Sequence, residues 1–272
     1  MQGGASRESL AAARERLDAL ATATGTDMVQ LAQELDSVVI LLDRTVSLRR
    51  VLTDSSRSGQ ARAAFLTQLL SGQISGTTAD LLGGLVHTRW SRPTDLVDAV
   101  AELSVSAELI AAERDGKLDD LEDELFRFGR IVAGERELRS ALTDPGVSNE
   151  RKAELVSGLL AERVQPVTRR LITRLVAHPR SRNLEHGLES YARLAADRRR
   201  RMVALVTVAL PLTEEQRTRL AAALGRMYGR EVHLNVEIDA DVIGGVRVEI
   251  GDDVIDGTVT TRLEEAGRRL AG

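Results

Sequence analysis

LRRVLTD at residues 48–54 recurs 90 positions later as LRSALTD at residues 138–144. The similarity extends without a gap over residues 31–92 and 121–182, with 18 identities in 62 positions. Self-similarity at a fixed period is the signature of a repeated structural unit. The sequence therefore predicts two tandem copies of one module.

Each copy shows the periodicity of amphipathic helices. Four apolar positions repeat at the same places and form the predicted core-facing stripe: Phe65, Leu66, Leu69 and Leu70 in the first copy, and Leu155, Val156, Leu159 and Leu160 in the second. Turn-forming residues precede both stripes, at 53–55 and 143–146. Pro93 is placed to start a helix, and residues 94–112 read as one long helix. Because this helix would close the first bundle and open the second, we expect the two bundles to be rigidly coupled.

The composition agrees with a helical fold. The chain has 272 residues, enough for more than one domain, and hydrophobic residues make up 43% of it. Aromatic residues make up only 2%, so the core must be built from Leu, Val, Ile and Ala. Such a mixture favours helix bundles over β-sandwiches.

After residue 201 the pattern changes to a mixture of strands and helices. Residues 202–210 form a β-branched apolar run that Pro211 ends, which is typical of a strand. Thr213 and Gln216 have the spacing of a capping box at the start of a helix. The remaining predicted elements are strands at 232–238 and 246–250 and a final helix at 258–270.

The predicted fold class is therefore mainly α, with two tandem helical bundles followed by a small α+β C-terminal domain. The expected boundaries are residues 1–104 for the first bundle, 105–201 for the second and 202–272 for the small domain. The two bundles would share the long helix around residues 94–112.

Charge, hydropathy and cysteine usage narrow the function classes. The net charge of -4 gives no overall basic field for nucleic acid. No apolar stretch approaches the ~20 residues of a membrane span, so we expect membrane association only through a partner. The absence of cysteine excludes disulfides and thiolate metal sites, and it suits a reducing compartment.

A search for reactive motifs finds none. The sequence lacks a phosphate-cradling glycine-rich loop with lysine, a helical pair of histidines and a glycine-flanked nucleophilic serine. The four histidines lie at scattered spacings, at His87, His178, His186 and His233. We therefore expect no catalytic residue, no cofactor and no metal, although an acid–base pair of carboxylates stays open from the sequence.

Two features have two interpretations each. The run Arg198–Arg201 could be a nucleic-acid or lipid patch, but it lacks interleaved aromatic residues, so a solvated helix end is the preferred interpretation. Trp90, the single tryptophan, has Arg180 as its repeat counterpart. We expect it to anchor a helix end in the core, with an interface anchor as the alternative.

An ordered series in the C-terminal segment carries a family resemblance. It comprises LPLTEEQ at 210–216, Tyr228-Gly229, Val232, Asp239, VIGGV at 242–246, Val248, IGD at 250–252, IDGT at 255–258 and Arg262-Leu263. This series resembles the delta subunit of F-type ATP synthases and its mitochondrial counterpart, the oligomycin-sensitivity-conferring protein. Residues 118–182 also resemble the N-terminal bundle of that family. A typical member has one such bundle, and this chain has two.

The resemblance implies a non-catalytic connector in the peripheral stalk of a rotary, proton-translocating ATP synthase. Family members bind N-terminal segments of alpha subunits through the helical bundle and hold the b-subunit stalk through the C-terminal region. The resemblance also implies a peripheral place on the cytoplasmic face of the bacterial plasma membrane, as part of the complex. The rival interpretations are a helical regulatory adaptor that shares only the small domain, and an enzyme.

By the arrangement of the family, the first and fifth helices of a copy form the groove for a partner helix. The candidate alpha-binding residues are Leu10, Leu17, Leu81 and Leu85 in the first copy, and Leu109, Leu171 and Leu175 in the second. Each of these leucines is also a plausible core residue. The sequence leaves open which copy binds an alpha subunit.

The candidate b-binding residues are Arg247, Glu249, Asp252 and Asp253. Residues 230–257 contain eight acidic and two basic residues, which suits a basic helical partner or simply keeps a small domain soluble. Strand alternation predicts that Val246, Val248 and Ile250 are buried and that Arg247 and Glu249 are exposed. A structural role at turns and strand ends is expected for Gly244, Gly245, Gly251, Asp256 and Gly257.

Overall fold

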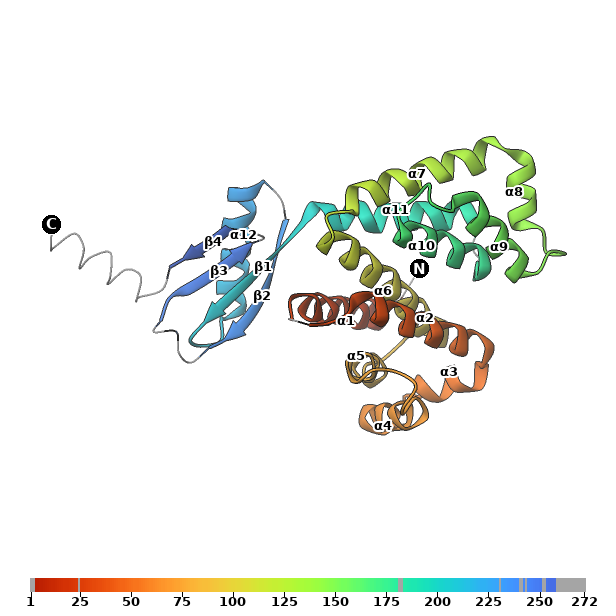
Figure 1. Ribbon diagram of the computed structural model, residues 1–272. Coiled ribbons are helices and arrows are strands. Elements are labelled where there is room, and N and C mark those ends of the chain that lie inside the picture. The colour runs from red at the N-terminus through yellow and green to blue at the C-terminus, as the bar shows by residue number, and fades with distance from the viewer. Residues whose placement is uncertain are drawn as a thin grey trace. The chain divides into compact units, whose positions relative to one another are not determined.

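The computed structural model describes residues 3–23, 25–180, 183–229, 231–239, 242, 244–250 and 253–257. The chain divides into two compact units, residues 1–196 and 197–272. Figure 1 shows the first unit as a body of helices and the second as a small sheet with a helix against it. Both copies of the sequence repeat therefore pack within one unit.

The first unit is helical throughout its ordered elements. The first copy contributes α1 (Gly4–Thr22), α2 (Met28–Arg44), α3 (Val46–Leu52), α4 (Gly59–Leu69) and α5 (Gly76–His87), and α6 (Pro93–Arg114) follows. The second copy contributes α7 (Leu118–Gly134), α8 (Arg136–Thr143), α9 (Asn149–Leu160), α10 (Pro166–Ala177) and α11 (Leu184–Arg200).

The helices repeat with the offset that the sequence shows. The bounds of α2 and α7 differ by 90 residues, as do those of α5 and α10. Leu52 ends α3 while its counterpart Leu142 lies in α8, and both side chains are buried. The helix starts repeat as well, because Ser58 and Ser148 each accept a backbone N–H bond, at 3.2 and 3.3 Å, as N-caps of α4 and α9.

The long helix predicted across the junction is confirmed as α6, which begins with Pro93. Its buried side chains belong to two different cores. Val100 and Leu103 pack in the core of the first copy, whereas Val105 and Leu109 pack in that of the second. In Figure 1, α6 runs between the helices of the two copies. One continuous helix therefore supplies both bundles, as the sequence predicts.

The predicted core-facing stripe is correct for only half of its residues. Leu66, Leu70, Val156 and Leu160 are buried, whereas Phe65, Leu69, Leu155 and Leu159 are 38–40% exposed. The reason is geometric. Successive residues on a helix point about 100° apart, and α4 and α9 pack mainly against one neighbour each, α5 and α10. A helix at the margin of a bundle buries one narrow stripe, so one residue of each adjacent pair stays outside.

The second unit is a mixed sheet crossed by one helix. Its elements are β1 (Arg201–Val208), α12 (Glu214–Tyr228), β2 (Glu231–Ile238), β3 (Val246–Ile250) and β4 (Asp253–Asp256). The strand order is β2-β1-β3-β4, with β1 and β2 parallel and the other pairs antiparallel. The parallel pair needs a crossover connection, which α12 provides. The edge strand β4 was not foreseen, because its four residues are all exposed and show no alternation.

Local signals account for the start and the buried face of α12. The predicted capping box is present, since Thr213 and Gln216 exchange side chain-to-backbone hydrogen bonds. Leu224 packs with alternate strand residues such as Val206 and Val248 in a small aliphatic core. The predicted final helix at 258–270 lies outside the described residues, as do Ser181, Arg182, Arg230, Ile243, Gly251 and Asp252.

Candidate helix-binding grooves

The seven leucines predicted to contact alpha subunits are core residues. Their exposed fractions lie between 1 and 6%, and they are Leu10 and Leu17 on α1, Leu81 and Leu85 on α5, Leu109 on α6, and Leu171 and Leu175 on α10. They lie on the first and fifth helices of each copy and belong to the hydrophobic cores of the two copies. Their side chains pack inward, however, so the surface that a partner could touch is formed mostly by neighbouring residues.

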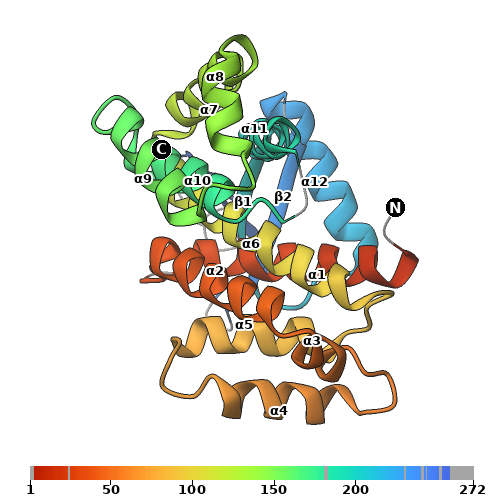
Figure 2. The same cartoon turned by 90° about the vertical axis from the view of Figure 1, so that its right-hand side faces the viewer.

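In the first copy this surface is an open groove between α1 and α5, which lie side by side (Figure 2). The hollow has a volume of about 560 Å³. Small residues dominate its lining, chiefly Ala12, Ala13, Ala63, Ala79, Gly83 and Gly84. A Cβ added at Gly83 would meet no other atom within 4 Å. Position 83 therefore faces open space.

Charged side chains lie on both walls of this groove. Arg16 on α1 and Asp80 on α5 line the groove, and both are exposed. Neither side chain makes a hydrogen bond or ion pair to any residue that the structure describes. A Cβ at Gly84 would lie 3.5 Å from Nη1 of Arg16, so the guanidinium reaches across the groove toward α5. The groove thus offers one cation and one carboxylate to an occupant.

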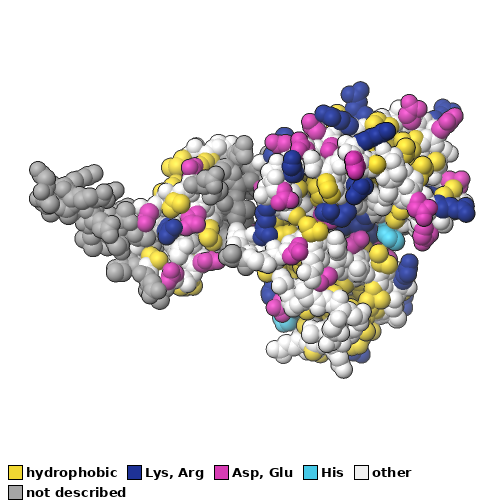
Figure 3. All heavy atoms as spheres, in the orientation of Figure 1, with side chains coloured by type: hydrophobic (Ala, Val, Ile, Leu, Met, Phe, Trp, Pro, Cys, Tyr) yellow, Lys and Arg dark blue, Asp and Glu magenta, His cyan; other side chains and the backbone are white. Residues whose placement is uncertain are grey.

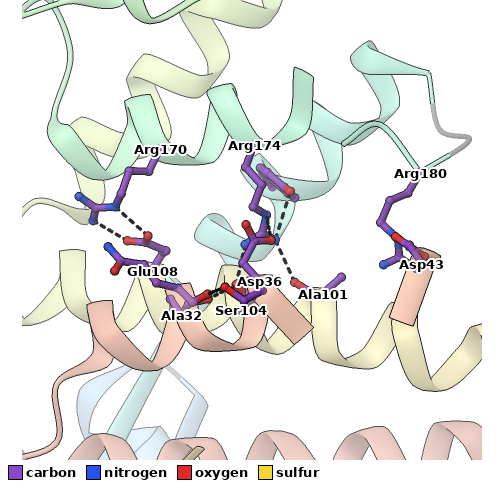
Figure 4. A network of polar contacts seen from close by, with 12 residues as sticks. Ala32, Asp36, Asp43, Ala101, Ser104, Glu108, Arg170, Arg174 and Arg180 are labelled. Carbon is purple, nitrogen blue, oxygen red and sulfur yellow. Dashed lines mark hydrogen bonds and ion pairs between the residues drawn. The ribbon is translucent and has the colours of Figure 1, made fainter. Parts of the chain in front are cut away.

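In the second copy, α2 of the first copy packs against α6, and a hollow of about 380 Å³ lies between α2, α6 and α10 (Figure 4). Arg174 of α10 pairs with Asp36 of α2 at 3.1 Å. Ser104 of α6 donates to the backbone carbonyl of Ala32 at 2.8 Å and lies 2.6 Å from Nη1 of Arg174. The guanidinium also donates to the carbonyl of Ala101 at 3.1 Å. One arginine therefore ties together three helices from the two copies.

Arg180 extends this joint between the copies, and Arg170 forms an ion pair within the second copy beside it. Arg170 forms a bidentate pair with the buried carboxylate of Glu108, at 2.8 and 2.6 Å, which raises the pKa of Arg170 above its usual value. Arg180 contacts Asp43 of α2 at 2.9 Å and Asp98 of α6 at 3.1 Å. Figure 4 shows Arg170, Arg174 and Arg180 pointing from the second copy toward α2 and α6.

The carboxylate of Asp36 is partly removed from water at this joint, which disfavours its charged form. Burial raises the pKa of Asp36, and the charge of Arg174 only partly offsets that effect. His178 and Arg180 also favour the charged carboxylate, whereas Glu108 opposes it. The aspartate is therefore held in place by cations of the second copy and would be poorly solvated without them.

The sequence interpretation did not identify the joint residues. A signal for them existed in the divergence between the two copies, because Gly84 is replaced by Arg174 and Trp90 by Arg180 at the 90-residue offset. Trp90 itself is buried and donates its indole N–H to the carbonyl of Leu85 at 2.8 Å. The expectation that Trp90 anchors a helix end in the core is therefore confirmed. Its counterpart Arg180 instead pairs with Asp43 and Asp98 at the joint.

In the second unit, three of the four candidate b-binding residues lie on β3 and β4, and the fourth, Asp252, is outside the described residues. Arg247 and Glu249 lie on the same face of β3 and pair with each other at 2.8 Å. Val248 and Ile250 are buried on the other face, and Val246 is partly buried. Asp253 on β4 accepts a hydrogen bond from the Tyr228 hydroxyl at 3.3 Å. Burial raises the pKa of Tyr228, and the negative charge of Asp253 and the hydrogen bond to it raise this pKa further.

Three glycines beside β3 and β4 have backbone angles or close contacts that disfavour a side chain. Gly244 and Gly245 have φ angles of 67° and 85°, a region in which a side chain is costly. At Gly257 an added Cβ would lie 3.1 Å from the carbonyl oxygen of Val246, to which the Gly257 N–H donates at 2.9 Å. Asp256 ends β4 opposite Arg247, and the turn after Gly257 lies beyond the described residues.

Neither a metal-binding cluster nor a membrane-spanning helix is found in the described part of the chain. No cluster of three His, Asp or Glu side chains there could hold a metal ion. None of the helices in these ranges is both long enough and apolar enough to cross a bilayer. On the face in Figure 3, basic and acidic side chains are interspersed over the helical unit.

The chain thus combines a duplicated helical scaffold with a small mixed-sheet unit. The family profile described as "ATP synthase delta (OSCP) subunit" matches residues 100–270. The chain belongs to the ATP synthase delta (OSCP) subunit family, whose place in the synthase is the peripheral stalk. The match begins at residue 100, so it covers the second copy and the small unit but not the first copy.

Similar proteins extend over the first copy as well. The ATP synthase subunit delta of Streptomyces griseus is 58% identical over 268 residues, which are 98% of this chain and 99% of that protein. The subunit delta of Thermobifida fusca is 45% identical over 269 residues, or 99% of each chain. A chain of the Toxoplasma gondii mitochondrial ATP synthase hexamer, solved by cryo-electron microscopy, covers 62% of this chain and 95% of its own at 23% identity, with a TM-score of 0.28, too low to support a structural conclusion.

Proposed function

We propose that the protein is a connector that links alpha subunits of the catalytic head to the b subunit of the peripheral stalk. The observation that carries this proposal is the open groove between α1 and α5, with its small lining residues and two unpaired charges. A surface of this kind suits the helix-in-groove mode of peptide recognition. The N-terminal segment of an alpha subunit is the proposed occupant.

The task of such a connector is mechanical. It must stop the head from turning with the rotor, which requires stiffness and slow dissociation and no reactive group of its own. The continuous helix α6 and the joint around Arg174 support stiffness in the first unit. We therefore propose that the subunit itself has no active site. Purified protein should neither hydrolyse ATP nor bind it saturably at micromolar concentration.

The second unit is proposed to hold the b subunit. Arg247, Glu249 and Asp253 lie along β3 and β4, and Asp252 between these strands is a further candidate. Acidic residues outnumber basic ones in this segment, so a basic helix end is the expected ligand. Rim charges act mainly on the association rate. A b-subunit fragment should therefore associate more slowly at high salt, while its dissociation rate changes little.

The test of the whole proposal is assembly. The tagged chain should co-purify with alpha, beta and b subunits from membranes of its own organism, and it should associate with the cytoplasmic face only when those subunits are present. Alpha-segment binding should need residues 1–196, and b-fragment binding should need residues 197–272. A chain that stays free of the synthase while folded would support the adaptor interpretation, which membership of the delta family disfavours.

A further inference from the structure

A basic hollow lies in the second copy, lined by residues of α8, α9, α10 and the start of α11 (helices labelled in Figure 1). Its volume is about 500 Å³. The charged residues of its lining are three cations and one anion, namely Arg136, Arg139, Lys152 and Glu185. Hydroxyl and amide groups come from Ser140, Thr143 and Asn183. The hollow therefore carries an excess of positive charge, although the net charge of the chain is -4.

Lys152 is the buried cation of this hollow. Only 6% of the residue is exposed, and its side chain makes no hydrogen bond or ion pair with any residue that the structure describes. Because the ammonium nitrogen is not fully enclosed, the small exposed part of Lys152 faces the hollow. A buried charge without a partner destabilises a fold. An anion in the hollow removes that cost.

The first copy shows how the fold itself can satisfy a cation at this position. Arg62, 90 residues before Lys152, is 4% exposed. Its guanidinium donates hydrogen bonds of 2.7–3.1 Å to five backbone carbonyls, those of Asp54, Arg57, Val86, His87 and Thr88. Lys152 donates to none of the corresponding carbonyls of the second copy. The repeat thus keeps a buried cation at this position, but only the first copy supplies its acceptors.

Two arginines that line the same hollow also have free donors. Arg136 is exposed, and its side chain makes no hydrogen bond or ion pair within the described residues. Arg139 uses only Nη1, which donates to the carbonyl of Ala133 at 3.3 Å and lies 3.4 Å from Glu185. Guanidinium groups bind phosphate oxygens in a bidentate manner, and lysine binds them as a point charge. The free donors therefore suit a phosphate group.

We propose that this hollow is a binding site for a phosphate group, held by Lys152, Arg136 and Arg139. A phosphate dianion matches the surplus of two positive charges that remains once Glu185 is counted. The site binds through side chains, so it needs no glycine-rich loop. Inorganic phosphate and a phosphate monoester share this chemistry. The inference goes beyond the proposed connector function and does not depend on it.

The experiment is calorimetric titration of the full-length chain with inorganic phosphate, glycerol phosphate and succinate at constant ionic strength. Lys152→Met removes the buried charge and keeps most of the side-chain length. Arg136→Gln changes an exposed residue, so a loss of binding in this variant does not come from unfolding. The matched control is Arg151→Gln, because Arg151 is an exposed cation next to Lys152 on α9 that does not line the hollow.

We expect saturable binding of phosphate by the wild type and roughly tenfold weaker binding by Lys152→Met, the scale of one charge-assisted hydrogen bond. The loss should be smaller for Arg136→Gln and absent for Arg151→Gln. Without phosphate, Lys152→Met should melt no lower than the wild type, because the change removes an unpaired buried charge. Tighter binding of glycerol phosphate than of inorganic phosphate would identify a phosphate ester as the ligand, and the reverse order would identify free phosphate.

Three results would overturn the site. The first is a wild type that binds no phosphate saturably or binds succinate equally well. The second is an equal loss of binding in all the variants, Arg151→Gln included. The third is a lower melting temperature of Lys152→Met combined with unchanged phosphate binding by Arg136→Gln, since Lys152 would then have a structural role only.

Discussion

At the scale of single residues, the two copies share a partly buried carboxylate that caps a helix. Glu34 on α2 accepts hydrogen bonds from the backbone N–H of Ser75 at 3.0 Å and from its hydroxyl at 2.8 Å, at the start of α5. Its counterpart Glu124 on α7 accepts from the backbone N–H of Gln165, at 3.0 Å, at the start of α10. A carboxylate at a helix N-terminus satisfies unpaired N–H groups and interacts favourably with the helix dipole. The second helix of each copy therefore fixes the start of the fifth.

This device predicts a pH dependence. Burial alone would raise the pKa of Glu34, but hydrogen bonds from Thr78 and Ser75 outweigh it, and the pKa lies below the ordinary 4.5. Because the folded pKa is depressed, the charged carboxylate stabilises the fold at neutral pH, and this contribution is lost as the pH falls from 4.5 through the folded pKa. The variant Glu34→Gln should therefore lose less stability on acidification than the wild type does.

The measurement is urea unfolding of both proteins at pH 7 and near pH 3.5. At pH 7 the variant should be less stable by about 1 kcal/mol, the scale of one ordinary hydrogen bond, because the carboxylate of Glu34 is only partly buried and keeps some hydration. Glu154→Gln, on the exposed side of α9, is the matched control and should follow the wild type at both pH values. Parallel pH profiles for wild type and Glu34→Gln would contradict the role assigned to this carboxylate.

At the scale of elements, the joint between the copies depends on ion pairs set in partly buried positions. The side chains of Arg174 and Asp36 are 13% and 26% exposed, so their attraction is screened less than that of a surface pair. By contrast, the α7 pair of Arg127 and Asp123 is 73% and 74% exposed with a separation of 3.7 Å. Pairs of the second kind contribute almost nothing to stability.

We expect Arg174→Ala to destabilise the first unit by about 2 kcal/mol, below the 3–5 kcal/mol of fully buried pairs because Asp36 keeps some contact with water. Arg127→Ala should cost less than about 0.5 kcal/mol. Chemical unfolding followed by circular dichroism measures both. In the double variant Asp36→Ala with Arg174→Ala the cost should be smaller than the sum of the single changes, because no unpaired charge is left. Additive costs would show that the two residues do not interact in solution.

At the scale of the whole molecule, the chain consists of two units with separate cores. Leu35 is fully buried in the core of the first copy, and Val206 is fully buried in that of the second unit. These cores share no residue among those described. Shortening a buried side chain should therefore destabilise only the unit that contains it.

Leu35→Ala should destabilise the first unit by about 3 kcal/mol, and Val206→Ala should destabilise the second by about 2 kcal/mol, from lost apolar burial and the cavity left behind. Hydrogen exchange read by mass spectrometry resolves the two units. Faster exchange should be confined to residues 4–196 for the first variant and to residues 201–256 for the second. Equal acceleration across both ranges in either variant would mean that the units unfold as one.

The sequence by itself determined the repeat, the helix pairs at a 90-residue offset, the continuous α6, the capping box of α12 and the family. Local signals of this kind, such as caps and apolar periodicity, act within a few turns of chain and can be read without coordinates. Tertiary structure decided which helix faces stay exposed, as for Phe65 and Leu155, and which residues of the two copies meet. Both depend on packing between segments far apart in the chain, such as Asp36 and Arg174, and the pattern of one helix does not encode its neighbours.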